Sequence, residues 1–152
     1  MDIEVVENIE DAIKCDELLT KLILSESEYD KNLRKDYVVK NYFENNFKHR
    51  NSVLYIVRKD ENNIIGYAYC KIITEDNGPT ISSIALLDGL YVESKYRNQG
   101  IATKLIEKCK KWSAKSGAQI FELNVMSANE SACKLYKQLG FIEIEKKMRL
   151  EL

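Results

Sequence analysis

The sequence predicts one α/β domain, residues 1–152, in which helices cover both faces of a mixed sheet of about seven strands. Three observations predict it. The chain has 152 residues, the length of one ordinary domain with its own core. Its apolar residues follow strand and helix spacings in the order βααβββαβαββ. No internal repeat, linker or low-complexity tract interrupts that order.

The charge balance argues against a general attraction to polyanions. The 23 basic and 24 acidic residues leave a formal net charge of −1, so neither nucleic acid nor a membrane is an expected partner. The first residues, Met1-Asp2-Ile3-Glu4, are acidic where a secretory signal would be basic, and no apolar run is long enough to span a membrane. We therefore expect a cytoplasmic protein.

The four cysteines, at positions 15, 70, 109 and 133, form no CxxC pair and no ligand-like group with the single histidine, His49. Three of them fall in apolar periodic segments, which favours reduced thiols packed in the core. His49 lies between Lys48 and Arg50 and is expected at the surface. We expect no metal site.

The first third of the chain predicts a short strand and two helices. Ile3 and Val5 alternate with polar residues, as in a strand. Two helical faces follow, the first made by Cys15, Leu18, Leu19, Leu22 and Ile23 and the second by Val39, Tyr42, Phe43 and Phe47. The acidic, hydroxyl-bearing stretch Ser25–Asp30 connects them.

Three strands are predicted in the middle of the chain. Ser52–Arg58 and Ile64–Ile73 are apolar runs on either side of a polar turn, so they form a hairpin. After a second turn at 76–79, a long strand runs from Ile81 to Val92. Asp88-Gly89 interrupts this strand, and a glycine inside a strand often marks a β-bulge.

The last third predicts a helix from near Gln99 to Ser116-Gly117, where lysines and a glycine favour its end. A strand at Ile120–Val125 and a short helix at Asn129–Leu139 follow, and Gly140 stops that helix. Two final strands are predicted at Phe141–Glu145 and Lys147–Glu151.

The stretch Arg97–Thr103 has the properties of an anion site. It begins a helix, where backbone N–H groups lack partners within the helix and the dipole is positive. Positions 95–104 carry no acidic residue that would neutralise this end. Gly100 lets the backbone approach a ligand closely, and the short side chain of Ala102 does not obstruct it. Arg97 adds positive charge. Together these properties suit a pyrophosphate.

Neither GxGxxG nor GxxxxGK[ST] is present, so the common nucleotide motifs are absent. Instead, Arg97-x-x-Gly100-x-Ala102, after the strand Leu90-Tyr91-Val92 and before a long amphipathic helix, resembles the acyl-CoA signature of the GNAT family of N-acetyltransferases. A second stretch, Asn129 to Phe141, is similar to the family's other signature and lies at the expected distance downstream. The resemblance covers the chain well from Val53 onward and loosely before it.

The resemblance implies a mostly antiparallel sheet and acetyl-CoA as the cofactor, with the backbone before the anion loop pairing with the pantetheine arm. In the family, the strands that correspond to Ile81–Val92 and Ile120–Val125 splay apart, and a bulge, here expected between Gly89 and Tyr91, frees an N–H toward the thioester carbonyl. The implied cofactor-binding residues are Leu90, Tyr91, Val92, Arg97, Asn98, Gln99, Gly100, Ile101, Ala102, Thr103, Asn129 and Tyr136.

Tyr136 is the predicted acid that protonates the departing thiolate. It shares a helix face with Asn129 and Cys133, and the ordinary pKa values of a phenol and a thiol lie within roughly two units. The alternative is a core tyrosine packed on Leu139. Asn129 is expected to cap its helix and to contact the cofactor as well.

Asp88 is the predicted base, because burial in an apolar strand would raise its pKa toward a useful value. In the polyamine branch of the family an acidic residue at this point faces the acceptor; the alternative is a carboxylate that caps the bulge. Tyr67, Tyr69 and Tyr91 either line the acceptor pocket or pack as strand aromatics usually do. Ser25–Asp30 is either a solvated loop or, as the family implies, part of a rim that attracts a cationic amine.

The sequence therefore predicts an acetyl-CoA-dependent N-acetyltransferase. It would use direct attack in a ternary complex on a small primary amine, such as a polyamine-like compound, an amino sugar or an amino acid. A peptide N-terminus or a lysine is an alternative acceptor. Two other classes stay open, a non-catalytic acyl-CoA-binding sensor and an acyltransferase for longer acyl chains. Homodimers are common in the family it resembles, so a homodimer is also considered.

Overall fold

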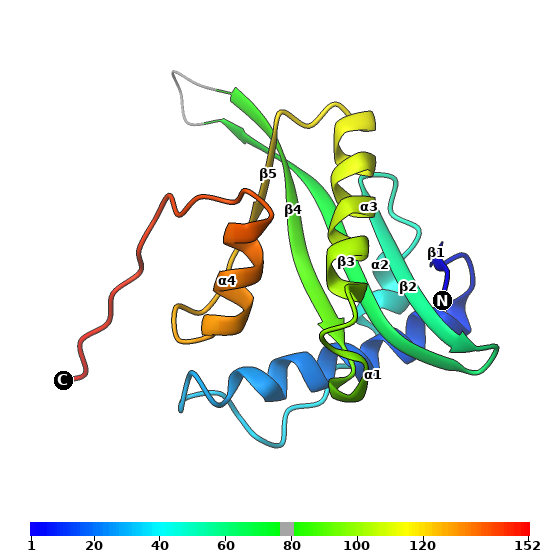
Figure 1. Cartoon of the computed structure of the whole chain (residues 1–152), viewed down its shortest axis with the longest axis horizontal. Helices are drawn as coiled ribbons and strands as arrows, with labels where there is room; N and C mark the ends of the chain where they lie inside the picture. The colour runs from blue at the N-terminus through cyan, green and yellow to red at the C-terminus, as the bar shows by residue number, and fades with distance from the viewer. Residues whose placement is uncertain (77–80) are drawn as a thin grey trace.

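The computed structural model describes residues 1–76 and 81–152, and its central element is a five-stranded sheet in the order β1-β2-β3-β4-β5 (Figure 1). The strands are β1 Ile3–Val5, β2 Ser52–Asp60, β3 Asn63–Asp76, β4 Ile81–Val92 and β5 Ile120–Leu123. Neighbours pair antiparallel except β4 and β5, which are parallel. The mixed, mostly antiparallel sheet and the β2–β3 hairpin are therefore confirmed. The turn predicted at 76–79 lies, from residue 77 on, outside the described residues.

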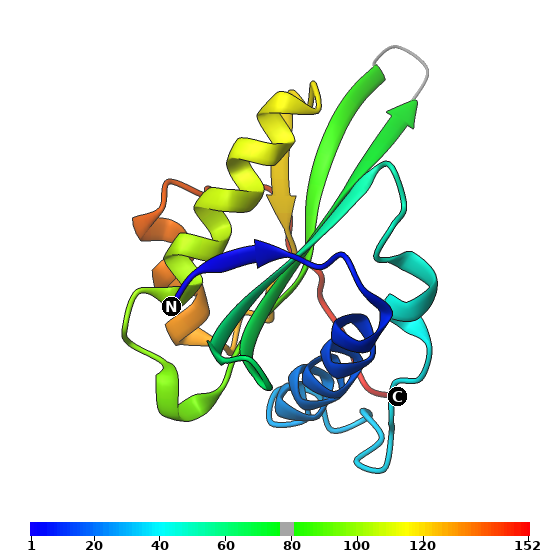
Figure 2. The same ribbon diagram turned by 90° about the vertical axis from the view of Figure 1, so that its right-hand side faces the viewer.

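Helices cover both faces of the sheet, as predicted (Figure 2). On one face α1 (Ile9–Glu26) and α2 (Tyr42–Asn46) enclose an apolar core that contains Phe43 and Tyr67. On the other face α3 (Ile101–Lys115) and α4 (Glu130–Gln138) pack against a second core around Leu105. Three cysteines are buried in these cores, as expected: Cys15, Cys70 and Cys109. Burial raises the pKa of the Cys15 thiol.

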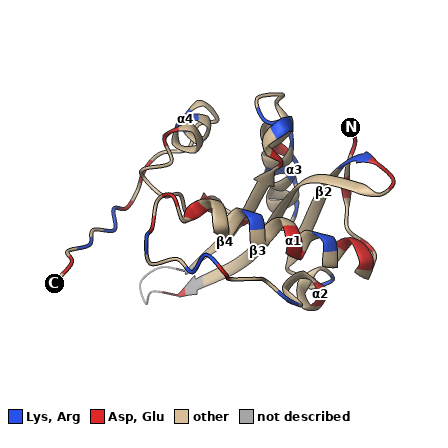
Figure 3. Cartoon of the chain, turned by 90° about the horizontal axis from the view of Figure 1, so that it is seen from below, with Lys and Arg blue, Asp and Glu red and all other residues tan. Residues whose placement is uncertain are grey.

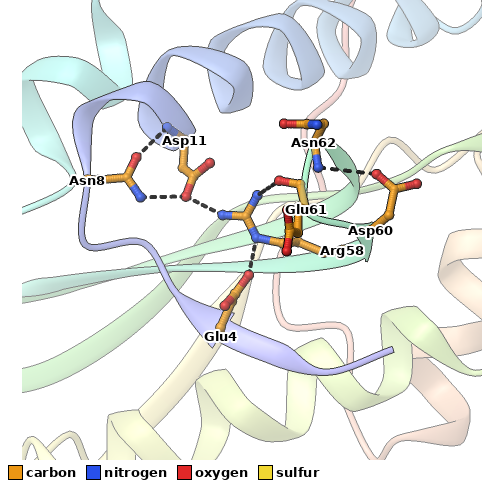
Figure 4. A network of polar contacts seen from close by, with 7 residues as sticks. All are labelled: Glu4, Asn8, Asp11, Arg58, Asp60, Glu61 and Asn62. Atoms are coloured by element: carbon orange, nitrogen blue, oxygen red, sulfur yellow. Dashed lines mark hydrogen bonds and ion pairs between the residues drawn. The ribbon is translucent and has the colours of Figure 1, made fainter.

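Arg58 on β2 joins β1 to the start of α1 (Figure 4). Its guanidinium pairs with Glu4 and Asp11 and donates to the carbonyl of Glu61 at 3.2 Å. Asn8 caps α1, because its side-chain oxygen accepts from the Asp11 N–H at 2.9 Å. Asp11 is only 5% exposed, so Arg58 supplies the opposite charge that a buried carboxylate requires.

The two final strands predicted at 141–145 and 147–151 are wrong. Residues 141–152 have no regular secondary structure and leave the end of α4 as an extended arm (Figure 1). A strand needs a neighbour for its N–H and C=O groups, and none of the described strands pairs with this segment. The described sheet therefore has five strands instead of about seven, and β5 ends two residues before its predicted end.

The described residues contain neither a membrane-spanning helix nor a cluster of metal ligands. None of the described helices is long and apolar enough to cross a membrane. No three His, Cys, Asp or Glu side chains within residues 1–76 and 81–152 gather closely enough to hold a metal ion.

Candidate functional site

The start of α3 is an open helix end. Gly100 precedes the helix with φ +76°, and Asn98, also left-handed at φ +60°, shapes the loop before it. No side chain caps α3, and its first turn holds no acidic residue. A Cβ placed on Gly100 would meet nothing within 4 Å, so the space in front of the helix is free. The unpaired N–H groups and the positive dipole end are therefore available to an anion, as predicted.

Arg97 ties this loop to the end of β4. Its Nε donates to the carbonyl of Val92 at 2.9 Å, and its guanidinium lies 5.5 Å from the centre of the Tyr91 ring. The positive charge expected from sequence is thus held beside the helix start by backbone and aromatic contacts. Lys95 lies in the same way over the Tyr96 ring, 5.2 Å from its centre.

β4 leaves one edge open directly after a bulge. Tyr69 pairs with Gly89 and Cys70 with Leu87, so Asp88 is an extra residue in β4. The bulge therefore falls within Asp88-Gly89, and its expected position between Gly89 and Tyr91 is wrong, because residues 89–91 pair regularly with β3. On the other side, pairing with β5 ends at Leu87, although β4 continues to Val92. The backbone of residues 88–92 therefore pairs with β3 on one side and with none of the described strands on the other. Pairing between β4 and β5 thus ends where the strands were expected to splay apart.

The prediction that Asp88 is buried is wrong, since 32% of its side chain is exposed. The bulge turns its carboxylate toward the α2 face, where the Lys71 ammonium lies 2.9 Å away and the Tyr42 hydroxyl donates at 3.2 Å. Burial, followed by the charge of Asp88, raises the pKa of Tyr42, which keeps that phenol a donor. The carboxylate is therefore held by Lys71 and Tyr42, which the sequence analysis did not identify as its partners.

Asp16 on α1 positions Tyr42. Its carboxylate accepts from the backbone N–H of Phe43 at 2.9 Å and of Tyr42 at 3.2 Å. It caps α2 in place of Asn41, whose own side chain makes no capping bond. Asp16 is 5% exposed, and these bonds compensate its burial.

Tyr67 approaches the bulge from β3. Its hydroxyl is buried and has no partner among the described residues, and a Cβ on Gly89 would lie 2.9 Å from it. Gly89 is therefore required by this close approach. Tyr67 and Tyr69 are 0% and 4% exposed and pack edge-on against Phe43 at 5.3 and 5.2 Å, so the packing alternative holds for both rings.

Tyr136 lies on α4, 5.7 Å from the Phe141 ring between ring centres. Burial raises the pKa of Tyr136 to about 12, and the charges of Cys133 and Glu26 add to the rise. The phenol is therefore protonated at neutral pH, as a proton donor must be. Asn129 caps α4 by accepting from the Ala132 N–H at 3.2 Å, as predicted.

Glu26, in the last turn of α1, is a further candidate residue that the sequence analysis named only as part of Ser25–Asp30. Burial raises the pKa of Glu26. Burial is also the main cause of the raised pKa of Tyr67 and of Tyr136, and the charge of Glu26 makes a smaller contribution to each. The spacing of four between Leu22 and Glu26 places Glu26 on the apolar face of the helix, a signal that the sequence did contain.

A hollow of about 410 Å³ opens beside Tyr42, between α1 and the segment that leads into α2. Its walls are formed by Leu19, Ile23, Tyr37, Val39, Lys40, Asn41, Tyr42, Asn45 and Asn46. Three side chains of the predicted rim Ser25–Asp30, which lies outside this hollow, are engaged within the chain. Ser25 and Ser27 donate back to helix carbonyls at 2.6 Å, and Asp30 pairs with Arg149 at 3.3 Å.

These features together define the class of protein. A mixed α/β sheet in which β4 continues past its pairing with β5, a bulge in β4 and an uncapped start of α3 are typical of an acyltransferase. The chain belongs to the acetyltransferase (GNAT) family, whose family model matches residues 17–141. It is 34% identical over 70 residues to an aminoglycoside N(6')-acetyltransferase type 1 from Acinetobacter genomosp. 13, which covers 46% of this chain and 48% of the relative.

The chain is also similar to a second acetyltransferase and, in fold, to a solved structure. The chain is 43% identical over 54 residues to thialysine N-epsilon-acetyltransferase from Mus musculus, covering 36% of this chain and 32% of the relative. The chain thus spans about half or less of the length of these relatives. The solved structure of a BH1408 protein tetramutant from Bacillus halodurans has the same fold, with a TM-score of 0.88, 20% identity and 100% coverage of both chains.

Proposed function

We propose that this protein is an acetyl-CoA-dependent N-acetyltransferase that acetylates a primary amine of a small molecule by direct attack in a ternary complex. The observation that carries the proposal is the juxtaposition of three features of β4. Its bulge at Asp88 faces the α2 side, its open edge follows, and the loop after it ends at the uncapped start of α3. Membership of the family supports the proposal.

The residues present fit the cofactor. The N–H groups at the start of α3 and the free space before Gly100 suit the two linked phosphates. The open backbone of Leu90, Tyr91 and Val92 suits the amides of the pantetheine arm, which would pair with it like an added strand. When bound, acetyl-CoA supplies an activated carbonyl and a thiolate leaving group. Asn129, Asn98, Gln99, Ile101, Ala102 and Thr103 complete the proposed contacts.

Two carboxylates are available to deprotonate the incoming ammonium. Asp88 is proposed as the base at the bulge, and the acceptor would displace the Lys71 ammonium that pairs with it. Glu26 is the alternative base, supported by the raised pKa that burial gives it. Both place negative charge on the acceptor side, which favours a cationic amine.

Tyr136 is proposed to protonate the departing sulfur. Its raised pKa keeps the proton on the phenol until a stronger base forms. Its ring packs on Phe141, which in turn packs on Phe121 of β5, so the phenol is held beside that strand.

A small polyamine-like compound, amino sugar or amino acid is the proposed acceptor. The names of the two relatives, which act on an aminoglycoside and on thialysine, support a small amine. A peptide amine is the second candidate, because the hollow beside Tyr42 is open to a longer chain.

The proposal is tested by a screen of amines with acetyl-CoA and detection of the released thiol. Wild type should turn over at least one small amine, whereas Tyr136→Phe should lose about 10- to 100-fold in kcat. Tyr55→Phe is the matched control, since Tyr55 is a partly buried tyrosine on β2. Saturable acetyl-CoA binding without turnover on any amine would instead favour a sensor. Parallel thermal shifts with succinyl- and longer-chain CoA address the acyl-chain alternative.

A further inference from the structure

Tyr67 on β3 carries a hydroxyl without a hydrogen-bond partner in the interior of the protein. The residue is 0% exposed, and within residues 1–76 and 81–152 its hydroxyl oxygen is the one buried side-chain N or O atom that makes no hydrogen bond. A buried polar group without a partner costs free energy, because it has lost its bonds to water. Since nearly all buried polar groups are paired, this hydroxyl is a candidate for a role other than folding.

The ring that carries this hydroxyl is held in place by its neighbours. It packs edge-on against Phe43, with 5.3 Å between the ring centres and 69° between the ring planes. Phe43 is itself 1% exposed, and its backbone N–H donates to Asp16 at 2.9 Å. The hydroxyl therefore has a fixed position, as a preorganised donor requires.

The hydroxyl lies against β4 at the point where one side of that strand loses its partner. A Cβ on Gly89 would lie 2.9 Å from the hydroxyl oxygen, so the phenol can approach only because position 89 has no side chain. Gly89 follows the bulge residue Asp88, and pairing with β5 has ended at Leu87.

This point of β4 is where the proposed function brings the thioester. The linked phosphates would lie at the start of α3, and the pantetheine arm would run from there along residues 92 to 90. The thioester at the end of the arm then comes next to Gly89, on whose other side the Tyr67 hydroxyl lies.

The phenol keeps its proton in this environment. The pKa of Tyr67 is raised mainly by burial. The charges of Cys15, Asp88 and Glu26 add to the rise. Tyr67 is therefore a hydrogen-bond donor at neutral pH and not a base.

The α1 side of the sheet is rich in negative charge. Glu26 ends α1, and Glu28 and Asp30 follow it, so the C-terminal end of this helix is acidic (Figure 3). Asp88 adds a carboxylate at the bulge, which Lys71 balances in the free protein. Carboxylates repel negative charge that develops on a nearby carbonyl oxygen, so an O–H donor to that oxygen lowers the barrier.

We infer that the Tyr67 hydroxyl donates a hydrogen bond to the thioester carbonyl oxygen and stabilises the negative charge that develops there when the amine attacks. The inference rests on the proposed function. Tyr67 forms no covalent bond and keeps its proton while the N–C bond forms and the C–S bond breaks. The amine proton goes to Asp88 or Glu26, and Tyr136 protonates the departing sulfur.

Tyr67→Phe removes the hydroxyl and keeps the ring. With an amine that wild type acetylates, kcat should fall at least about tenfold, whereas the KM values of amine and acetyl-CoA should stay within about twofold. The melting temperature should equal or exceed that of wild type, because a buried hydroxyl without a partner is removed. Tyr55→Phe is the matched control, since Tyr55 is partly buried against the core on the opposite face, and should change none of these quantities.

A second measurement needs no turnover. The infrared carbonyl stretch of acetyl-CoA, isotope-labelled at the acetyl carbonyl, is recorded in complexes with wild type and with both variants. A hydrogen bond to the oxygen weakens the C=O bond, so the frequency should be higher with Tyr67→Phe than with wild type or Tyr55→Phe.

The outcomes separate this inference from the proposed function. Equal carbonyl frequencies in wild type and Tyr67→Phe overturn the inference alone, as does an unchanged kcat. A lower kcat together with a lower melting temperature assigns Tyr67 to packing and also overturns it. Wild type that acetylates none of the amines contradicts the proposed function, whereas a frequency difference in the same protein still supports the hydrogen bond.

Discussion

The N-termini of α1 and α3 differ in how their unpaired backbone N–H groups are satisfied. Each helix begins with N–H groups that lack partners within the helix. At α1 the Asn8 side chain accepts one of them, Glu10 and Asp11 lie in the first turn, and Arg58 balances the buried Asp11. At α3 a left-handed Gly100 takes the capping position, no side chain caps the helix, and the first turn contains no acid.

The difference separates a structural helix end from a binding one. The chain supplies its own negative charge to α1 and none to the first turn of α3, so the start of α3 can accept an anion from outside, as the proposed function requires. The proposed phosphate site is thus a helix N-terminus without a side-chain cap, whereas α1 and α4 are capped by Asn8 and Asn129.

The largest expected effect is that of Gly100→Glu, which gives α3 an acid like those at α1. A glutamate at φ +76° is strained and repels phosphate, so coenzyme A should bind at least about 100-fold more weakly by calorimetry. Gly117→Glu is the matched control, because Gly117 is left-handed at φ +82° at the other end of α3. Equal losses in both variants would mean that strain, and not the site, explains the result.

Glu26→Gln should lower kcat by about 10- to 100-fold if Glu26 is the base, and raise the melting temperature at pH 8. Burial raises the pKa of Glu26, so its favourable protonated state is present at low pH and is lost as pH rises through the folded pKa. The gain in melting temperature should therefore vanish near pH 4. Glu28→Gln should change neither quantity, because Glu28 is an exposed acid two residues further along the chain. A variant with full kcat would leave Asp88 as the base.

Lys71→Met should lower the KM of a cationic acceptor by about two- to fivefold, because the ammonium that now pairs with Asp88 is removed. Steady-state kinetics against the acceptor measures it, with Lys59→Met on the exposed end of β2 as control. An increase in KM would assign Lys71 to acceptor binding instead.

Asn8→Ala should cost about 1 kcal/mol of stability through loss of the α1 cap and leave coenzyme A binding unchanged. Asn129→Ala removes a comparable cap from α4 and should in addition weaken coenzyme A binding, if Asn129 contacts the cofactor. Denaturant unfolding and calorimetry on both variants separate the two roles. Identical binding in the two variants would limit Asn129 to capping.

Features with a local cause were predictable from the sequence. The bulge at Asp88-Gly89 follows from a glycine within a strand, and the open start of α3 follows from the missing acids after Lys95. The partners of Asp88 were not predictable, because Lys71 and Tyr42 lie 17 and 46 residues away and meet it only through strand register and the Asp16 cap. Phe141–Glu151 has a correct strand pattern but no partner within the described residues, which a pattern alone cannot reveal.

The most direct measurement compares free coenzyme A with pantetheine, which lacks the phosphates, in calorimetric titrations of the wild-type protein. If the α3 end is a cradle for two linked phosphates, coenzyme A should saturate one site and bind at least about 100-fold more tightly than pantetheine. Equal affinities, or no heat with coenzyme A, would contradict the account.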